Sequence, residues 1–177
     1  SGHIGLRIHD GQLLHLIKQL PAEECDLINA AERPMIISGH GVMISEAEKE
    51  LAALAEKADI PVTATLLGLS TIPSSHPLYK GMLGMHGNIG PNVNTNRCDL
   101  LVAVGMRFDD RVTGDTSKYA KQAKIVHIDI DSSEFDKNVK TTATVHGDAQ
   151  EVLARLLPLV NEAKHTEWLQ TFDEMAL

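Results

Sequence analysis

A cluster of charged residues follows an apolar stretch of the chain. Residues 100–104 are all apolar, which is typical of a strand buried on both faces, and Gly105 ends this run. Two arginines and two aspartates come next: Arg107, Asp109, Asp110 and Arg111. Ligands of parallel sheets bind outside the carboxyl ends of the strands. A glycine there allows the backbone to approach the ligand closely, and an arginine can form two parallel hydrogen bonds with a phosphate or carboxylate. The pattern indicates an anion-binding loop, and a surface loop with mutually paired charges would show it too.

A glycine turn lies earlier in the chain, at residues 39–41 (Gly-His-Gly). It follows the apolar run 35–37, which predicts a strand, and precedes a helix expected from about residue 46, where Ser45 and Glu48 form a capping box. Such a turn can bring backbone N–H groups to a phosphate. The third glycine of a G-x-G-x-x-G fingerprint would fall at Ile44, so a tight turn without a ligand fits equally well.

Acidic residues occur after one predicted strand and are missing after another. The strand expected at 62–65 lacks the acid that holds ribose hydroxyls in nicotinamide dehydrogenases, which counts against that class. The strand expected at 124–129 ends in Asp129, whose carboxylate can accept hydrogen bonds from ribose. Asp131 and Glu134 form a D-x-x-E pattern that predicts a cap for a short helix. A calcium loop is not indicated, because its glycine and distal glutamate are absent.

A long loop is expected at 68–90, and long loops in compact domains are usually functional or disordered. Within it, Met85 can pack on a flat ligand and His86 can donate a hydrogen bond. Simple gap filling by Met85 and a solvated His86 are the alternatives. The nine histidines of the chain lack the close spacings of a zinc site, so no metal site is predicted.

The composition narrows the class of protein. A formal net charge of −8 argues against a nucleic-acid partner, and an aromatic content of 3% leaves little for a base-stacking surface. The two cysteines lie far apart and form no CxxC motif, which suits a reducing compartment and predicts a cytoplasmic location. No apolar run approaches the length of a membrane span and no signal-peptide pattern opens the chain, so no membrane partner is expected.

Strand and helix patterns alternate along the chain, which predicts an α/β fold. We expect a three-layer, Rossmann-like parallel sheet of five or six strands, with helices on both faces and right-handed crossovers. The chain, 1–177, is predicted to form a single domain with a core at about 32–160, a helical lead-in at 1–31 and a C-terminal linker at 161–177. Trp168, in that linker, is expected to pack against a partner outside this chain.

Three longer motifs resemble those of one enzyme family. They are residues 82–87 (MLGMHG), 105–114 (GMRFDDRVTG) and 124–131 (KIVHIDID). In this order and spacing they resemble the catalytic subunit of acetohydroxyacid (acetolactate) synthase, over roughly residues 32–159. Several long motifs in register are far more specific than one short pattern. The matching segment is the central domain of that thiamine diphosphate enzyme.

The resemblance implies a function for the parent enzyme. That enzyme joins two 2-keto acids with loss of carbon dioxide, a transferase reaction of branched-chain amino acid biosynthesis. Thiamine diphosphate and Mg²⁺ bind outside the segment represented by this chain, and FAD lies across the central domain without a redox part in the main reaction. The implied partners are the flanking thiamine-binding domains of the same polypeptide, further copies of the full enzyme in a homo-oligomer, and a regulatory subunit.

Carried over motif by motif, the resemblance implies a set of FAD contacts and of substrate-channel residues. The FAD contacts are Gly39, His40, Gly41, Thr65, Leu66, Leu67, Leu83, Gly84, Met85, His86, Gly105, Arg107, Asp109, Val112, Asp129, Ile130, Glu134, Gly147 and Asp148. Met85, Asp110 and Arg111 are implied to face the substrate channel. Many relatives have three glycines at the first turn, so His40 departs from the pattern and is expected to narrow the pyrophosphate site.

The groups that activate the thiamine are absent from this chain. By the resemblance, the activating glutamate belongs to the preceding domain and the diphosphate–magnesium motif, Gly-Asp-Gly followed by paired asparagines, to the next. Here Gly147-Asp148 is followed by Ala149, with no Asn-Asn downstream. We therefore expect this chain to be inactive alone, with no catalytic residue of its own. Two alternatives are a flavin-free spacer domain of a related thiamine diphosphate enzyme and a free-standing nicotinamide-dependent enzyme.

Overall fold

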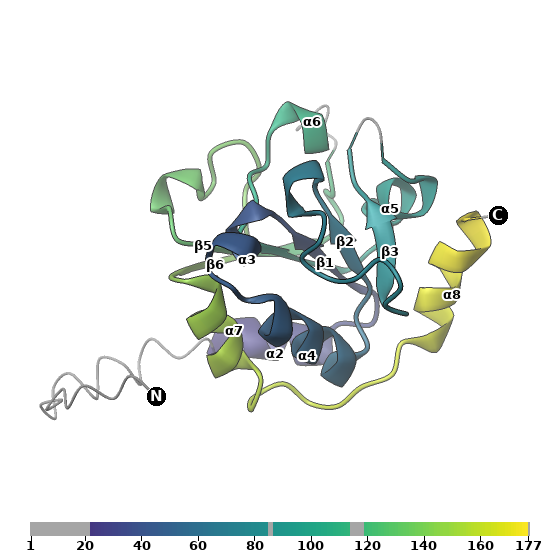
Figure 1. The fold of residues 1–177 in the computed structure, drawn as a ribbon, viewed down its shortest axis with the longest axis horizontal. Helices are drawn as coiled ribbons and strands as arrows, with labels where there is room; N and C mark the ends of the chain where they lie inside the picture. The colour runs from purple at the N-terminus through teal and green to yellow at the C-terminus, as the bar shows by residue number, and fades with distance from the viewer. Residues whose placement is uncertain (1–21, 85–86, 114–118, 177) are drawn as a thin grey trace, which may run out of the picture.

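The computed structural model describes residues 22–84, 87–113 and 119–176, with the side chains of all except residues 110 and 111. One sheet contains six parallel strands in the order β3-β2-β1-β4-β5-β6 (Figure 1). The strands are β1 (Pro34–Ser38), β2 (Val62–Ala64), β3 (Tyr79–Met82), β4 (Leu100–Val104), β5 (Lys124–Asp129) and β6 (Ala143–His146).

The direction in which strands are added reverses between β1 and β4. The chain builds outward from β1 through β2 to β3, then returns to the other side of β1 for β4, β5 and β6. This is the strand order of doubly wound dinucleotide-binding folds, whose ligands bind at the reversal point beyond the carboxyl ends of the strands. The prediction of an α/β fold with a parallel sheet of five or six strands is confirmed.

Helices cover both faces of the sheet. They are α2 (Ala22–Ala30), α3 (His40–Ile44), α4 (Glu48–Ala58), η1 (Leu66–Gly68), α5 (Ile89–Asn94), α6 (Asp110–Thr113), η2 (Ser132–Glu134), α7 (Ala149–Leu156) and α8 (Thr166–Met175). Figure 1 shows α2, α4 and α7 grouped along one face of the sheet, with α5 and α8 together at the β3 side. None of the helices in the described ranges has the length and apolar character needed to cross a membrane.

Two hydrophobic clusters lie on the two faces of the sheet, because successive side chains of a strand point to opposite sides. In β1, Ile36 packs into the cluster beneath α2, α4 and α7, whereas Met35 and Ile37 pack into the cluster that contains Trp168 and Phe172. Every residue of β1 and of β4 is buried. β4 is accordingly an unbroken apolar run and β1 is apolar up to Ser38, which is typical of a sheet covered on both faces.

Strand β3 lies inside the segment that the sequence predicts as a long loop. Its sequence, YKGM, has no apolar run, and only Gly81 of its four residues is buried. β3 pairs with β2 alone, so it is an edge strand whose side chains are half exposed. Backbone pairing holds it in the sheet, and such a strand carries little hydrophobic signal in its sequence.

The predicted capping box at Ser45 and Glu48 is wrong. The turn after β1 already forms the short helix α3, and the Ser45 hydroxyl donates to the Gly41 carbonyl of that helix at 2.9 Å. Glu46 has a φ of 56°, which breaks the chain direction before α4. The N-cap of α4 is Ala47, without a side-chain hydrogen bond. Because α3 begins almost directly after β1, Ser45 lies at the C-terminal end of α3 and its hydroxyl binds a carbonyl of that helix.

The chain after residue 160 folds back onto the sheet, contrary to the expectation that Trp168 packs against something outside the chain. Trp168 and Phe172 of α8 are 6% and 3% exposed and meet edge to face, with ring centroids 5.1 Å apart. The Trp168 indole donates to the Pro34 carbonyl at 2.7 Å, and the Asn94 amide donates to the Thr171 hydroxyl at 2.9 Å. These contacts attach α8 to β1 and to α5. Residues 1–21 of the expected lead-in lie outside the described residues.

Both cysteine thiols should resist modification in the folded protein. Burial raises the pKa of Cys98 to about 12, and it also raises the pKa of Cys25. Since the thiolate is the reactive form, Cys98 at pH 8 should react about a thousandfold more slowly than an ordinary thiol. Labelling with a disulfide reagent, followed by absorbance, should show both thiols slow in the folded chain and fast in guanidinium. Rapid labelling of Cys98 in the folded chain would contradict its burial.

Candidate functional site

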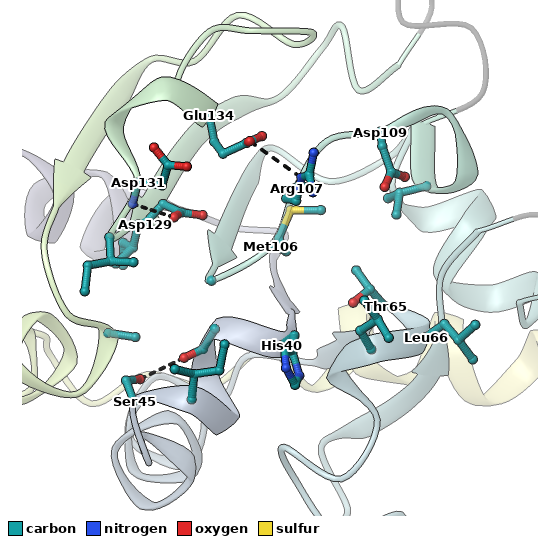
Figure 2. Close-up of a pocket in the computed structure, with 18 of the residues that line it drawn as sticks. His40, Ser45, Thr65, Leu66, Met106, Arg107, Asp109, Asp129, Asp131 and Glu134 are labelled. Carbon is teal, nitrogen blue, oxygen red and sulfur yellow. Dashed lines mark hydrogen bonds and ion pairs between the residues drawn. The ribbon is translucent and has the colours of Figure 1, made fainter.

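A cleft of about 790 Å³ opens beyond the carboxyl ends of the strands, at the point where the strand order reverses. The segments that follow all six strands contribute to it. Figure 2 shows Asp129, Asp131 and Glu134 on one side of the cleft and Thr65 and Leu66 on the opposite side. The cleft therefore has one polar, acidic side and one more apolar side.

Backbone contact between two glycine loops forms the floor of the cleft. The Gly39 amide donates to the Val104 carbonyl at 3.0 Å, and the Gly41 amide donates to the Gly105 carbonyl at 2.9 Å. A Cβ atom on Gly39 would lie 2.4 Å from the Gly105 carbonyl oxygen, and one on Gly41 would lie 2.7 Å from the Gly105 Cα. Only glycine allows this approach. Because these two amides bind backbone carbonyls, they hold the loops together and are not available to a phosphate.

His40 occupies the middle of the glycine turn without disturbing its backbone. It is the first residue of α3, and its exposed side chain lines the cleft. The close contacts fall on the glycines at either side of it, so position 40 is sterically able to carry a side chain. The imidazole adds a polar group at a point where a third glycine would leave only backbone.

The acidic side of the cleft is organised by local hydrogen bonds. The Asp129 carboxylate is 9% exposed and accepts from the Asp131 amide at 2.9 Å. Asp131 caps η2 by accepting from the Ser133 amide and hydroxyl, and these bonds hold the pKa of Asp131 below its usual value. The predicted D-x-x-E cap at this position is confirmed for Asp131. Asp148 caps α7 by accepting from the Glu151 amide at 3.2 Å.

One arginine extends over the acidic side. Arg107 Nε lies 3.6 Å from Glu134 Oε1, and Lys137 Nζ lies 3.8 Å from the same oxygen. The Arg107 side chain is 68% exposed, whereas that of Glu134 is 12% exposed. A guanidinium held at its Nε in this way keeps its terminal N–H groups for another partner.

Exposed aliphatic side chains gather around the mouth of the cleft. Ile44, Leu66, Leu67 and Ile130 are between 64% and 72% exposed, and all four line the cleft. We call these four residues the aliphatic lip. Large exposed apolar groups that gather at one place mark binding surfaces, because isolated ones are common but clusters are not.

The structure brings most of the predicted site residues to this one cleft. The predicted residues that line it are His40, Gly41, Thr65, Leu66, Leu67, Leu83, Gly84, Gly105, Arg107, Asp109, Val112, Asp129, Ile130, Glu134, Gly147 and Asp148. Gly39 belongs to the floor through its backbone contact but does not line the cleft. Met85 and His86 lie outside the described residues, as do the side chains of Asp110 and Arg111.

Seven further residues line the cleft that were not predicted to do so: Ile44, Ser45, Met82, Met106, Ile128, Asp131 and Ala149. Most are immediate neighbours of predicted residues, such as Met106 between Gly105 and Arg107. Ile44 is the informative one, because it stands where the third glycine of the fingerprint would be. It closes the apolar run Val42-Met43-Ile44 after the glycine turn, and this run was the available signal. Among the described residues no group of three or more His, Cys, Asp or Glu side chains could hold a metal ion.

Comparison with known proteins identifies the family. The family described as thiamine pyrophosphate enzyme, central domain, matches residues 22–156. A probable acetolactate synthase large subunit of Methanocaldococcus jannaschii is 48% identical over 152 residues, which cover 84% of this chain and 26% of the relative. The acetolactate synthase large subunit of Corynebacterium glutamicum is 48% identical over 138 residues, covering 78% of this chain and 22% of the relative.

A third relative, the acetolactate synthase isozyme 1 large subunit of Escherichia coli, is 44% identical over 149 residues, again 84% of this chain and 26% of the relative. The chain thus spans about a quarter of the length of these relatives. The strand order, the position of the cleft and the matched residues agree with one another. This chain belongs to the family of central domains of thiamine pyrophosphate enzymes, of the kind found in acetolactate synthase large subunits.

Proposed function

We propose that this chain is the central domain of an acetolactate synthase and that its cleft binds FAD. In the parent enzyme, two 2-keto acids are joined with loss of carbon dioxide, as a step of branched-chain amino acid biosynthesis in the cytoplasm. Thiamine diphosphate and Mg²⁺, which supply the bond-forming chemistry, are held by the flanking domains. The observation that supports the FAD site best is the gathering of sixteen of the predicted contact residues in one cleft of about 790 Å³.

The residues of the cleft fit the parts of FAD. Its volume lies within the range of about 300–1,000 Å³ that is typical of ligand pockets. The aliphatic lip offers apolar surface to a flat ring system, and Arg107 offers N–H groups to a diphosphate. Asp129 offers carboxylate oxygens to ribose hydroxyls. Since the amides of Gly39 and Gly41 bind within the protein, these two amides do not contact the diphosphate, and the side chains of Arg107 and His40 are available to it.

Removal of the guanidinium should weaken the flavin. We expect FAD to bind the 177-residue chain saturably, with quenching of flavin fluorescence, and Arg107→Ala to weaken binding about tenfold, the value of one charge-assisted hydrogen bond. Arg155→Ala, which removes an exposed arginine from α7, is the matched control and should leave the affinity unchanged. Equal affinities of the two variants would exclude Arg107 from the site.

The alternative of a flavin-free spacer domain is decided by the same titration. A spacer has no need of a polar cleft beneath an aliphatic lip, which favours the FAD site. Saturable quenching supports the FAD site, and the absence of any saturable response up to millimolar flavin supports the spacer. A nicotinamide-dependent enzyme is the weaker alternative, because β2 ends at Ala64 and Thr65, Leu66 and Leu67 follow it with no acid. Calorimetry with NAD tests this alternative.

The chain alone should not form acetolactate. We expect no product above the uncatalysed rate from pyruvate, thiamine diphosphate, Mg²⁺ and FAD, because the glutamate and the diphosphate–magnesium motif implied by the resemblance are absent. The colorimetric acetoin assay checks this, with an intact acetolactate synthase as the positive control. Product formation by the isolated chain would show that the flanking domains are not required for catalysis.

The remaining proposals concern the assembled enzyme. We propose that this domain packs against the flanking thiamine-binding domains of its own polypeptide, within a homo-oligomer that also accepts a regulatory subunit. In that assembly Met85, Asp110 and Arg111 face the substrate channel. The support for this arrangement is the resemblance of residues 82–87 and 105–114 to the family motifs.

A further inference from the structure

His127 is a fully buried histidine in β5, and none of the roles described so far uses it. Its ring lies edge to face between Phe108 and Phe135, at centroid distances of 5.1 and 5.2 Å and interplanar angles of 79° and 80°. The chain has only three phenylalanines, so two of the three enclose this one ring. The aromatic contacts fix the direction in which the two ring nitrogens point.

The two nitrogens of this ring have different surroundings. Nε2 lies 2.9 Å from the Met106 carbonyl oxygen and 3.6 Å from Asp129 Oδ2. Nδ1 is buried and has no hydrogen-bond partner within the described ranges. A proton on Nε2 is therefore donated to Met106, whereas a proton on Nδ1 would be buried without an acceptor, at a cost of about 1–3 kcal/mol. The contacts select the tautomer that carries its proton on Nε2.

The groups that His127 contacts belong to the two loops that form the polar side of the cleft. Met106 is followed directly by Arg107, and Phe135 is preceded directly by Glu134, the residue that pairs with Arg107 at 3.6 Å. The imidazole thus contacts the chain neighbour of each member of an ion pair, and the two members stand on different loops. A displacement of either loop would change the position of the guanidinium in the cleft.

We propose that His127 is a positioning residue for the ligand site. Its Nε2–H holds the Met106 carbonyl, and its ring supports Phe135, so that the loops at 105–109 and 129–135 keep the spacing at which Arg107 meets a diphosphate. The part of this inference that concerns the diphosphate rests on the proposed function. The part that concerns the tautomer and the loops does not depend on it.

The tautomer and the loops are tested without ligand. Nitrogen-15 NMR of the imidazoles in the 177-residue chain, with the His127 signals assigned from their loss in His127→Phe, should show Nε2 protonated and Nδ1 bare. Amide hydrogen exchange at 105–109 and 129–135 should be at least tenfold faster in His127→Phe, which keeps a ring but loses the donor. In Trp168→Phe, which also loses a buried N–H donor to a backbone carbonyl, but at the opposite end of the sheet, exchange at these loops should be unchanged.

Ligand binding shows whether His127 acts through its hydrogen bond or only by filling space. We expect His127→Phe to bind FAD about tenfold more weakly than the unaltered chain, and His127→Gln, which keeps an amide donor, to restore most of that loss. Trp168→Phe should bind FAD normally. If the unaltered chain binds no FAD, the proposed function fails, whereas the NMR and exchange results still decide the role of His127.

Three results would overturn the proposal. The first is a proton on Nδ1 of His127 in the NMR spectra. The second is exchange at the two loops that rises equally in His127→Phe and Trp168→Phe, which would indicate general destabilisation. The third is normal FAD affinity of His127→Phe together with weak binding by His127→Gln, which would assign the effect to ring packing and not to the hydrogen bond.

Discussion

Gly105→Ala should lower the free energy of unfolding by about 3 kcal/mol or more, because it combines backbone strain with overpacking. Gly105 has a φ of +58°, a conformation that costs an L-residue about 1–2 kcal/mol. Its added Cβ would also lie 2.7 Å from the Gly41 Cα and 2.8 Å from the Val42 nitrogen. These are backbone atoms, which cannot rotate aside, and such overpacking costs about 1–3 kcal/mol more.

Chemical denaturation followed by circular dichroism measures this loss. For a chain of this size the expected loss corresponds to a fall of the melting temperature by roughly 6–12 °C. Gly147→Ala is the matched control, since Gly147 also lines the cleft but its Cβ would meet only the Val152 methyl group, at 3.1 Å. That variant should stay within about 0.5 kcal/mol of the parent. Equal stabilities of the two variants would mean that the floor of the cleft is looser than described.

Trp168→Ala should cost about 3–5 kcal/mol, the range for removal of a large buried aromatic side chain. The indole is 6% exposed, packs on Phe172 and donates to the Pro34 carbonyl at 2.7 Å. The variant therefore loses burial, a ring contact and the partner of a buried carbonyl together. We expect α8 to detach from the sheet and expose Met35 and Ile37, with lower solubility as a visible consequence.

Urea denaturation with fluorescence detection is unsuitable here, because Trp168 is the only tryptophan, so circular dichroism is the measurement. Glu167→Ala, an exposed change in the first turn of the same helix, is the control and should stay within about 0.5 kcal/mol of the parent. If Trp168→Ala were as stable as Glu167→Ala, α8 would act as the linker that the sequence suggests and not as part of the core.

The sequence was most informative where burial is complete. β4 is apolar and buried throughout, and β5 is buried except for Lys124. The ends of both strands were placed correctly from the sequence alone, at residues 100–104 and 124–129. β3 was missed because an edge strand needs only backbone pairing, and YKGM shows neither alternation nor an apolar run. The periodicity of apolar residues reveals strands whose side chains are buried in the core, and an edge strand with half-exposed side chains lacks that periodicity.

Two other differences have local causes. Ser45 satisfies the pattern of an N-cap, but a short helix already ends there, and its hydroxyl binds the carbonyl four residues before it. Trp168 stands in a tail of mixed polarity, so its burial depends on a surface made by residues 35, 37 and 94, which are distant in sequence. Local pattern cannot specify a partner that exists only after the sheet has formed.

Most of the residues that the family resemblance assigns to one site line one cleft, although they are far apart in the chain. Arg107 and Asp129, for example, stand after different strands and line the same cleft. The role of the glycines was understood less well. The pattern at 39–41 fits a phosphate-binding turn and a tight turn without a ligand equally well. In the structure the amides of Gly39 and Gly41 donate to the carbonyls of Val104 and Gly105, at the end of β4.

The floor of the cleft consists of main chain pressed against main chain, and this restricts how the protein can diverge. Substitution at Gly39, Gly41 or Gly105 forces the two loops apart, so natural selection can hardly alter ligand preference there without loss of the fold. The aliphatic lip carries no such constraint, because its side chains already stand in solvent. Evolution of new ligand preferences on this scaffold is therefore expected to proceed through the lip while the glycines stay invariant.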